Sequence, residues 1–133
     1  NATMILDTSA LLAILYVEED AERFAEALAA SEQRLMSAAN YLEAGIVVDS
    51  QRGAAAGRQL DALMSRASIG VEAVTREQAD IARQAYLDFG KGNHPAGLNF
   101  GDCFAYALAK AKGLPLLFKG DDFSKTDVTS VLN

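Results

Sequence analysis

The residues of this chain best suited to chemistry are carboxylates that lie far apart in the sequence and directly after apolar runs. Asp7 follows Met4-Ile5-Leu6, a run suited to a buried strand. The pair Asp121-Asp122 comes shortly after a second such run, Leu116-Leu117-Phe118. Open α/β sheets place their ligand crevices at the carboxyl ends of their strands. These acids are therefore candidates for a shared site.

Two more acids lie inside predicted helices. Asn99 is a good N-cap, and Asp102 follows it by three residues, in the first turn of a helix whose apolar face includes Phe104. Glu43 lies in a helix that begins after Ser37 and is apolar almost all round. Each acid also has a simpler explanation. Asp102 would complete a helix cap, and Glu43 would point to solvent from the polar edge of its helix.

Strand-length apolar runs alternate with helical patterns along the chain, which favours a parallel sheet covered by helices. We expect an α/β three-layer sandwich with a central, mostly parallel sheet of four to five strands. The expected strands are 4–6, 34–36, 71–74 and 116–118, with the tail 125–132 as a candidate edge strand. Helices are expected at 10–15 (capped by Thr8 or Ser9) and 19–30, and after Ser37, Gly57, Thr75 and Asn99. In such a sheet the strand ends and the following helix starts share one edge, where the acids would meet.

Several carboxylates that converge without matching arginines repel one another and need a cation. Oxygen ligands without a Cys/His cluster favour Mg²⁺ or Mn²⁺ over Zn²⁺. Mg²⁺ takes one or two protein carboxylates and completes its coordination with water and substrate phosphate. This donor set is the one used for metal-assisted hydrolysis of phosphodiester bonds.

Composition restricts the protein class. A chain of 133 residues with half of them apolar predicts one folded domain, 4–133, and residues 1–3 are expected to be an expression remnant or a disordered start. No apolar run approaches the roughly 20 residues of a membrane span, and no signal peptide is evident, so we expect a cytoplasmic protein without membrane contact. The net charge of -6 argues against bulk attraction to nucleic acid, although residues 91–119 hold four lysines against one acid. Cys103 is the only cysteine and is expected to be a buried hydrophobe.

Four segments together resemble the PIN-domain ribonucleases, and among them the VapC-type toxins of prokaryotic toxin–antitoxin pairs. Met-Ile-Leu-Asp-Thr-Ser-Ala-Leu at 4–11 is similar to the opening strand of the family with its Asp, and Tyr-Leu-Glu at 41–43 is similar to the segment that carries its second acid. Leu-Asn-Phe-Gly-Asp-Cys-Phe-Ala-Tyr-Ala-Leu-Ala at 98–109 and Leu-Leu-Phe-Lys-Gly-Asp-Asp-Phe at 116–123 resemble the third and fourth. Any one segment is a weak signal, whereas four in order at this spacing are specific.

The resemblance implies a role for each acid. Asp7 and Asp102 would be the direct metal ligands, and Glu43 would help to hold the ion or position the attacking water. Asp122, immediately before Phe123, is the preferred fourth acid, with Asp121 as the alternative. The implied activity is Mg²⁺-dependent endoribonucleolytic cleavage, with Mn²⁺ as a second candidate ion.

The resemblance also implies supporting residues and partners. Thr8 or Ser9 would hydrogen-bond near the metal site, and Lys119 is a candidate contact to the RNA backbone, with Lys91 and Lys110 as further candidates. The family resemblance implies a homodimer held by helix faces. It also implies a VapB-like antitoxin whose C-terminal segment crosses the active-site groove and directs an Arg or Lys toward the carboxylates.

Two other functions fit parts of the sequence. Aspartyl-nucleophile phosphatases also begin with a strand that ends in Asp, but they need a second Asp two residues later, where this chain has Ser9. A non-catalytic binding module on the same fold would use its acidic groove only to receive a basic segment of a partner. Binding of Mg²⁺ or Mn²⁺ would separate the nuclease from the binding module.

Overall fold

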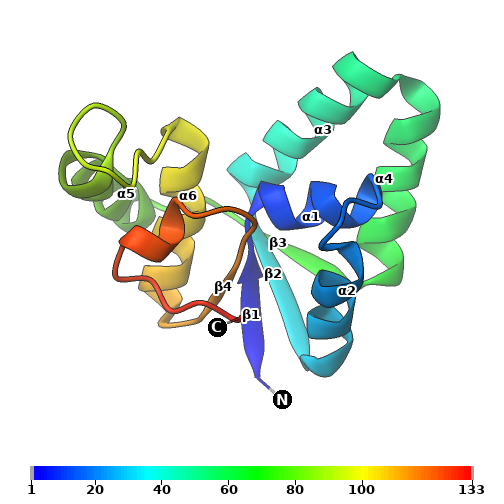
Figure 1. Cartoon of the computed structure of the whole chain (residues 1–133), viewed down its shortest axis with the longest axis horizontal. Coiled ribbons are helices and arrows are strands. Elements are labelled where there is room, and N and C mark those ends of the chain that lie inside the picture. The colour runs from blue at the N-terminus through cyan, green and yellow to red at the C-terminus, as the bar shows by residue number, and fades with distance from the viewer. Residues whose placement is uncertain (1, 133) are drawn as a thin grey trace.

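The sheet has four strands, and every pair of neighbours is parallel, in the computed structural model, which describes residues 2–132 (Figure 1). The strands are β1 (Thr3–Leu6), β2 (Gln33–Ser37), β3 (Ile69–Glu72) and β4 (Leu116–Leu117), in the spatial order β3-β2-β1-β4. The α/β prediction with a parallel sheet of four to five strands is confirmed. β1 lies in the interior of the sheet, so Asp7 leaves the sheet at a central strand.

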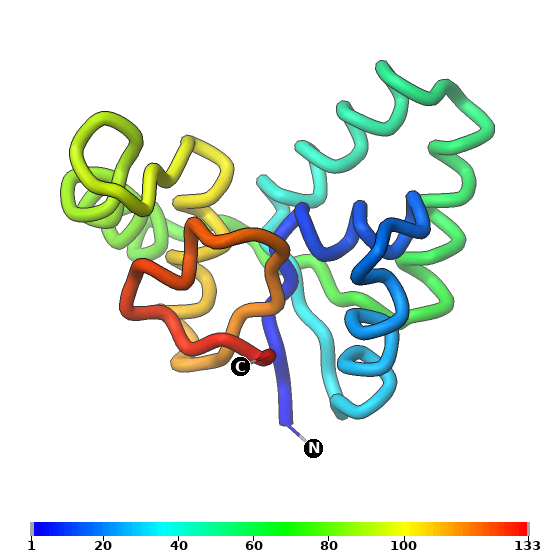
Figure 2. Tube along the Cα trace, in the orientation of Figure 1, coloured from blue at the N-terminus to red at the C-terminus, as the bar shows by residue number. Residues whose placement is uncertain are grey.

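Helices cover the two faces of the sheet and complete three layers. They are α1 (Thr8–Leu15), α2 (Ala21–Ala30), α3 (Ala38–Arg52), α4 (Ala54–Arg66), α5 (Arg76–Phe89) and α6 (Phe100–Lys112), and a 3-10 turn spans Phe123–Lys125. Helices α5 and α6 lie on one side of the sheet and α1 to α4 on the other (Figures 1 and 2). Successive strand residues face opposite ways. Met4 and Leu6 therefore join the core under α1 and α2, while Ile5 joins the core under α6.

The folded part of the chain begins before Met4, the start that the sequence indicates. Thr3 belongs to β1 and pairs with Gln33, and the Ala2 carbonyl accepts a hydrogen bond from the Glu32 N–H at 3.0 Å. The expected disordered start at residues 1–3 is wrong for Ala2 and Thr3, because the Glu32 N–H bonds the Ala2 carbonyl and Gln33 of β2 pairs with Thr3. Asn1 lies outside the described residues.

Several element boundaries differ from those expected. β3 begins at Ile69, two residues early, because Ile69 to Glu72 pair with β2. Helix α1 begins at Thr8, and its N-cap is Asp7 rather than Thr8 or Ser9, while α2 begins at Ala21 rather than Glu19. The expected edge strand in the tail is reduced to one parallel bridge between Leu116 and Ser130.

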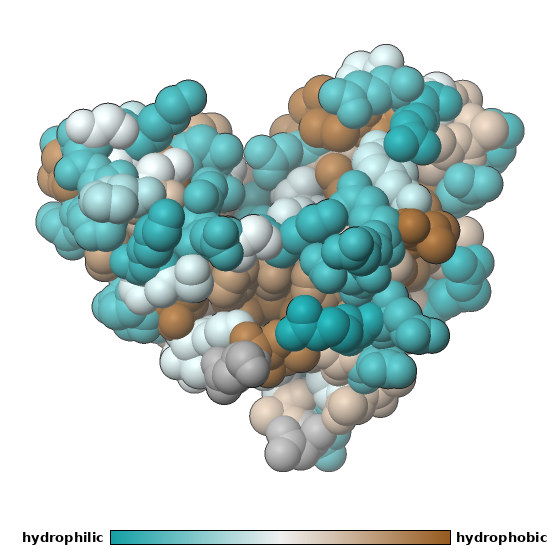
Figure 3. Space-filling view, in the orientation of Figure 1, coloured by the Kyte–Doolittle hydropathy of each residue, from teal (hydrophilic) through white to brown (hydrophobic). Residues whose placement is uncertain are grey.

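The surface is hollowed between two lobes, one formed by α5 and α6 and the other by α3 and α4 (Figure 3). The amino ends of α1, α3 and α6 gather at this notch, above the carboxyl end of β1 (Figure 1). Among residues 2–132, no helix has the length and apolar character needed to cross a membrane.

Candidate active site

Two hydrogen bonds tie the starts of α1, α3 and α6 together and bring three acids to one place. Thr8 Oγ1, at the start of α1, donates to Glu43 Oε1 in α3 at 2.7 Å. Asn40 Nδ2, in the first turn of α3, donates to the Gly101 carbonyl in α6 at 2.9 Å. Asp7 precedes Thr8, and Asp102 follows Gly101. Asp7, Glu43 and Asp102 therefore lie in one region, where the charges of Asp102 and Glu43 act on Asp7.

Asp7 is the buried acid of the group, with 4% of its surface exposed. Burial is the largest cause that raises the pKa of Asp7, from 3.8 to about 7, and the charges of Asp102 and Glu43 add to it. The Ser9 N–H and hydroxyl both donate to Asp7 Oδ2, at 3.0 and 2.6 Å, which lowers the pKa and offsets part of the effect. The ionised form of Asp7 thus destabilises the folded protein unless a cation lies beside it.

Asp102 caps the start of α6 and also interacts with the other acids of the site. Its backbone N–H donates to Asn99 Oδ1 at 2.9 Å, and its own Oδ2 accepts from the Asn99 N–H at 3.0 Å, which makes a complete capping box. Burial raises the pKa of Asp102, and the charges of Asp122 and Glu43 raise it further, while the Asn99 N–H lowers it. The capping explanation is correct, and it does not exclude the carboxylate from the acidic site.

Glu43 does not point away into solvent. Its Oε1 accepts from Thr8 Oγ1 and also from Asn40 Nδ2, at 3.3 Å. Its other oxygen, Oε2, lies so close to Gly101 that a Cβ atom at position 101 would overlap it. The carboxylate of Glu43 is therefore fixed against the first turn of α6.

The paired acids after β4 are both exposed, but they differ in their surroundings. The charge of Asp122 contributes to the raised pKa of Asp102, which places Asp122 near the acidic site. The backbone carbonyl of Asp121 accepts a hydrogen bond from Ser124 Oγ at 2.6 Å and so closes the turn. Asp122 is therefore the acid of this pair whose charge acts on Asp102.

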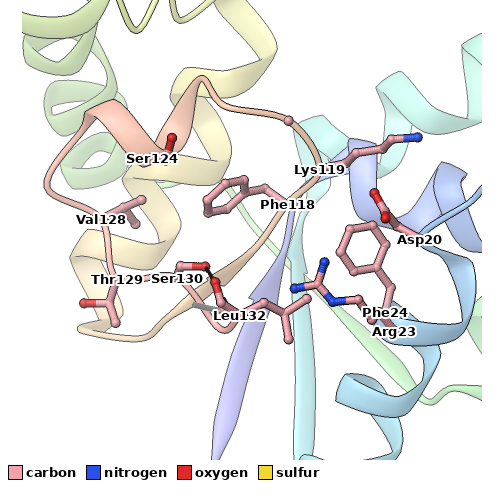
Figure 4. Close-up of a pocket in the computed structure, with 11 residues that line it drawn as sticks. Asp20, Arg23, Phe24, Phe118, Lys119, Ser124, Val128, Thr129, Ser130 and Leu132 are labelled. Atoms are coloured by element: carbon pink, nitrogen blue, oxygen red, sulfur yellow. Dashed lines mark hydrogen bonds between the residues drawn. The ribbon is translucent and has the colours of Figure 1, made fainter.

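Ser9 links the acidic site to the loop after β4. Its hydroxyl donates to Asp7 Oδ2 and accepts from the Lys119 backbone N–H at 2.9 Å. The Lys119 ammonium forms a salt bridge with Glu18 at 2.6 Å. Figure 4 shows Lys119 at the upper rim of a pocket of about 570 Å³, which Arg23 of α2 and residues of the C-terminal tail also line. Lys119 thus lies beside the site, with its charge partly offset by Glu18.

Asn40 and Gly101 are the two site residues that the sequence did not single out. Asn40 is fully buried, and it lies three residues before Glu43, which puts the two on one face of α3. Gly101 lies inside the first turn of a helix, where glycine costs stability relative to alanine. Each residue left one signal in the sequence. Asn40 is a polar residue three positions before the candidate acid Glu43, and Gly101 is an unfavourable helix residue next to the candidate acid Asp102.

The match to known families agrees with this geometry. The family model described as PIN domain matches residues 4–128, almost the whole chain. The chain belongs to the PIN-domain family.

Named relatives of this PIN domain cover nearly its full length. The VapC ribonuclease Mb0640 of Mycobacterium bovis is 54% identical over 96% of this chain and 98% of its own. Ribonuclease VapC of Mycolicibacterium smegmatis is 56% identical over 96% and 99%. The crystal structure of Mycobacterium tuberculosis VapC20 matches the fold with a TM-score of 0.77 at 17% identity, over 95% of this chain and 96% of that one. VapBC2 of Rickettsia felis matches with a TM-score of 0.75 at 12% identity, over 96% of each chain.

The acidic site of this PIN domain offers oxygen atoms, the type of ligand that a hard divalent cation prefers. Its donors are carboxylate oxygens, and two of these carboxyl groups, Asp7 and Asp102, have raised pKa values. Among residues 2–132, no three His, Cys, Asp or Glu side chains are already close enough to enclose an ion. Cys103 is buried as expected, and burial raises its pKa to about 11, which does not suit a thiolate ligand.

Proposed function

We propose that this PIN domain is a divalent-metal-dependent endoribonuclease that acts in the cytoplasm as the toxin of a toxin–antitoxin pair. The observation that carries the proposal is the meeting of buried Asp7 with Glu43 and Asp102 at the carboxyl end of β1. The names of the relatives that are more than half identical, VapC ribonucleases, support RNA as the substrate. We also propose that residues 4–133 belong to a single domain, which Thr3 joins as the first residue of β1.

Each residue of the site has a separate task in this proposal. Asp7 and Asp102 would hold the ion, Mg²⁺ or alternatively Mn²⁺, and Asp122 would add a nearby negative charge. The bound ion would supply an activated water and offset charge on the phosphate. Ser9 fixes the Asp7 carboxylate through its two hydrogen bonds. Glu43, fixed by Thr8, orients the attacking water or helps to hold the ion.

Lys119 is the proposed contact to the RNA backbone. Its backbone N–H is one hydrogen bond from Ser9, and Ser9 bonds Asp7, so a phosphate near the acids lies within reach of the Lys119 side chain. The salt bridge to Glu18 would have to exchange for a phosphate. Lys91 is exposed, whereas Lys110 is paired with Asp127 at 3.1 Å, which makes Lys110 the weaker candidate.

The proposed protein partner is a VapB-like antitoxin. Solved structures similar in fold include a toxin–antitoxin complex from Klebsiella pneumoniae and VapBC2 of Rickettsia felis bound to a DNA fragment from their promoter. A basic side chain of the antitoxin directed at Asp7 and Asp102 would relieve the repulsion between these carboxylates. Such a contact would compete with the metal ion for the same oxygens.

A homodimer is the proposed oligomeric state. On α3, Leu42 and Ile46 lie one turn apart and expose 60% and 57% of their surface, and Tyr41 adjoins them. An apolar row of this kind on a helix is typical of a covered face. Sedimentation of the purified chain alone tests this part of the proposal, since a monomer at micromolar concentration would contradict it.

The function is tested by RNA cleavage with purified protein. We expect the wild-type chain to cut RNA with Mg²⁺ or Mn²⁺ and to stop when EDTA is added. Asp7→Asn should abolish cleavage, because it removes a charged metal ligand without changing the side-chain shape. Asp61→Asn, an exposed acid on α4, is the matched control and should cleave normally. Full activity of Asp7→Asn would refute the assignment.

A binding module without catalysis is the second candidate, and it is favoured by the spacing of the acids, since no three of them within residues 2–132 are close enough together to hold a metal ion. Titration calorimetry separates the two functions. The nuclease predicts heat of binding with Mg²⁺ or Mn²⁺ that Asp7→Asn abolishes. The binding module predicts no metal binding and retained affinity for a basic partner segment.

A further inference from the structure

Asn40 is a buried amide that links two helices at the acidic site. It has 0% of its surface exposed. Its Nδ2 donates to the Gly101 carbonyl at 2.9 Å and to Glu43 Oε1 at 3.3 Å. Both partners are acceptors only, so the amide must present its nitrogen to them. The orientation of Asn40 is therefore fixed by its neighbours.

Packing alone does not explain an amide at position 40. Asn40 Oδ1 is buried and has no hydrogen-bond partner, and such an unsatisfied atom costs stability. A leucine of similar shape would avoid this cost. The amide at position 40 is thus explained by its two donated hydrogen bonds rather than by packing.

Two donors hold the Glu43 carboxylate from one side, and Gly101 limits it from the other. Asn40 and Thr8 both donate to Oε1 of Glu43. A Cβ at position 101 would overlap Oε2, so the carboxylate occupies the space that Gly101 leaves empty. Because Asn40 also bonds the Gly101 carbonyl, it sets the separation of α3 and α6 at the point where Glu43 lies between them.

The geometry points to Asn40 as a positioning residue of the proposed nuclease, whose amide holds the Glu43 carboxylate against the first turn of α6, facing Asp7 and Asp102. The inference rests on the proposed function. Asn40 touches neither the ion nor the RNA and acts only through Glu43 and Gly101. Aspartate at position 40 would lose both donors and add a repelling charge.

The test compares Asn40→Leu with wild type in Mg²⁺ affinity by calorimetry and in steady-state RNA cleavage. We expect affinity for Mg²⁺ to fall about tenfold, the usual effect of removing a residue that orients a metal ligand. The rate constant kcat should fall by about the same factor while KM for RNA stays unchanged, because Asn40 does not bind RNA. Gln78→Leu removes another buried amide, in the first turn of α5, and should change neither quantity.

A double-mutant cycle separates positioning from a general structural role. If Asn40 acts through Glu43, then Asn40→Leu should change kcat less than about twofold in a Glu43→Gln background. An equal loss in the two backgrounds would overturn the inference, and so would wild-type Mg²⁺ affinity in the single variant. If Asn40→Leu does not fold, as judged by circular dichroism, Asn40→Ala takes its place in the same cycle.

A crystal structure of the metal-free Asn40→Leu variant gives a result that is independent of catalysis. We expect the Glu43 carboxylate to leave its place against Gly101. If it stays in place, Asn40 does not position it and the inference is wrong. If the wild-type chain neither binds Mg²⁺ nor cuts RNA, the proposed nuclease fails on its own, and this crystal structure alone decides whether Asn40 positions Glu43.

Discussion

Replacing Asp7 with asparagine should make the metal-free protein more stable near neutral pH. Burial, together with the charges of Asp102 and Glu43, raises the pKa of Asp7 from 3.8 to about 7. One pKa unit corresponds to about 1.4 kcal/mol, so at about pH 8 the ionised Asp7 costs the folded state up to roughly 4 kcal/mol. Asparagine has the same shape and no charge, and should recover most of this free energy.

The gain should depend on pH in a defined direction. A folded-state pKa above the unfolded value means that the Asp7 penalty is absent below about pH 4 and complete above about pH 7. The advantage of Asp7→Asn should therefore shrink by roughly 2–3 kcal/mol between about pH 8 and about pH 5. For a chain of this length that difference is roughly 8–12 °C in Tm.

Thermal unfolding followed by circular dichroism, in EDTA and at several pH values, measures this effect. Asp61→Asn serves as the control, since Asp61 is exposed on α4, and its Tm should follow wild type at every pH. Two results would refute this reasoning: an equal gain in stability for Asp7→Asn at about pH 5 and about pH 8, or a loss of stability at the higher pH. Either would mean that the ionised Asp7 carboxylate does not destabilise the folded protein.

Three further outcomes follow from the site. Asp102→Asn should abolish cleavage. At about pH 8 it should raise Tm by less than Asp7→Asn does, because the Asn99 N–H loses a charged acceptor. Cleavage and thermal unfolding assays on the same samples check both outcomes. Gly101→Ala should weaken Mg²⁺ binding about tenfold by displacing Glu43, while retaining the fold by circular dichroism, and normal affinity would contradict the close packing. Lys119→Ala should weaken RNA binding equally for all sequences and lower the slope of log affinity against log salt by about 1. Fluorescence anisotropy measures this in the Asp7→Asn background, which binds RNA without cutting it. An unchanged slope would mean that Lys119 does not contact the RNA backbone.

The sheet and the acids were predictable because both leave strong local patterns. Apolar runs such as Met4-Ile5-Leu6 predict buried strands, and their alternation with helices predicts parallel pairing. Asn99 and Asp102 form a capping box that is legible from spacing alone, and the structure contains it. Asp7 was placed at the site by the general rule for strand ends, although the sequence did not show that it caps α1.

The residues that were missed depend on contacts between distant segments. Asn40 and Gly101 are 61 positions apart, and neither is unusual until α3 and α6 are packed together. The early start of β1 at Thr3 depends in the same way on β2, which supplies a partner at Gln33. The pattern of α3 alone could not show whether Glu43 faces solvent or the acidic site, because the hydrogen bond that holds Glu43 comes from Thr8 in α1.

The double use of Asp102 affects how a protein of this kind can lose its activity during evolution. The same carboxylate that belongs to the acidic site closes the capping box at the start of α6, whereas Asp7 is a charge that the folded state tolerates poorly. Selection against a harmful nuclease would therefore find neutralisation of Asp7 less costly to folding than loss of Asp102. Descendants that have become harmless should more often keep the acid at position 102 than the acid at position 7.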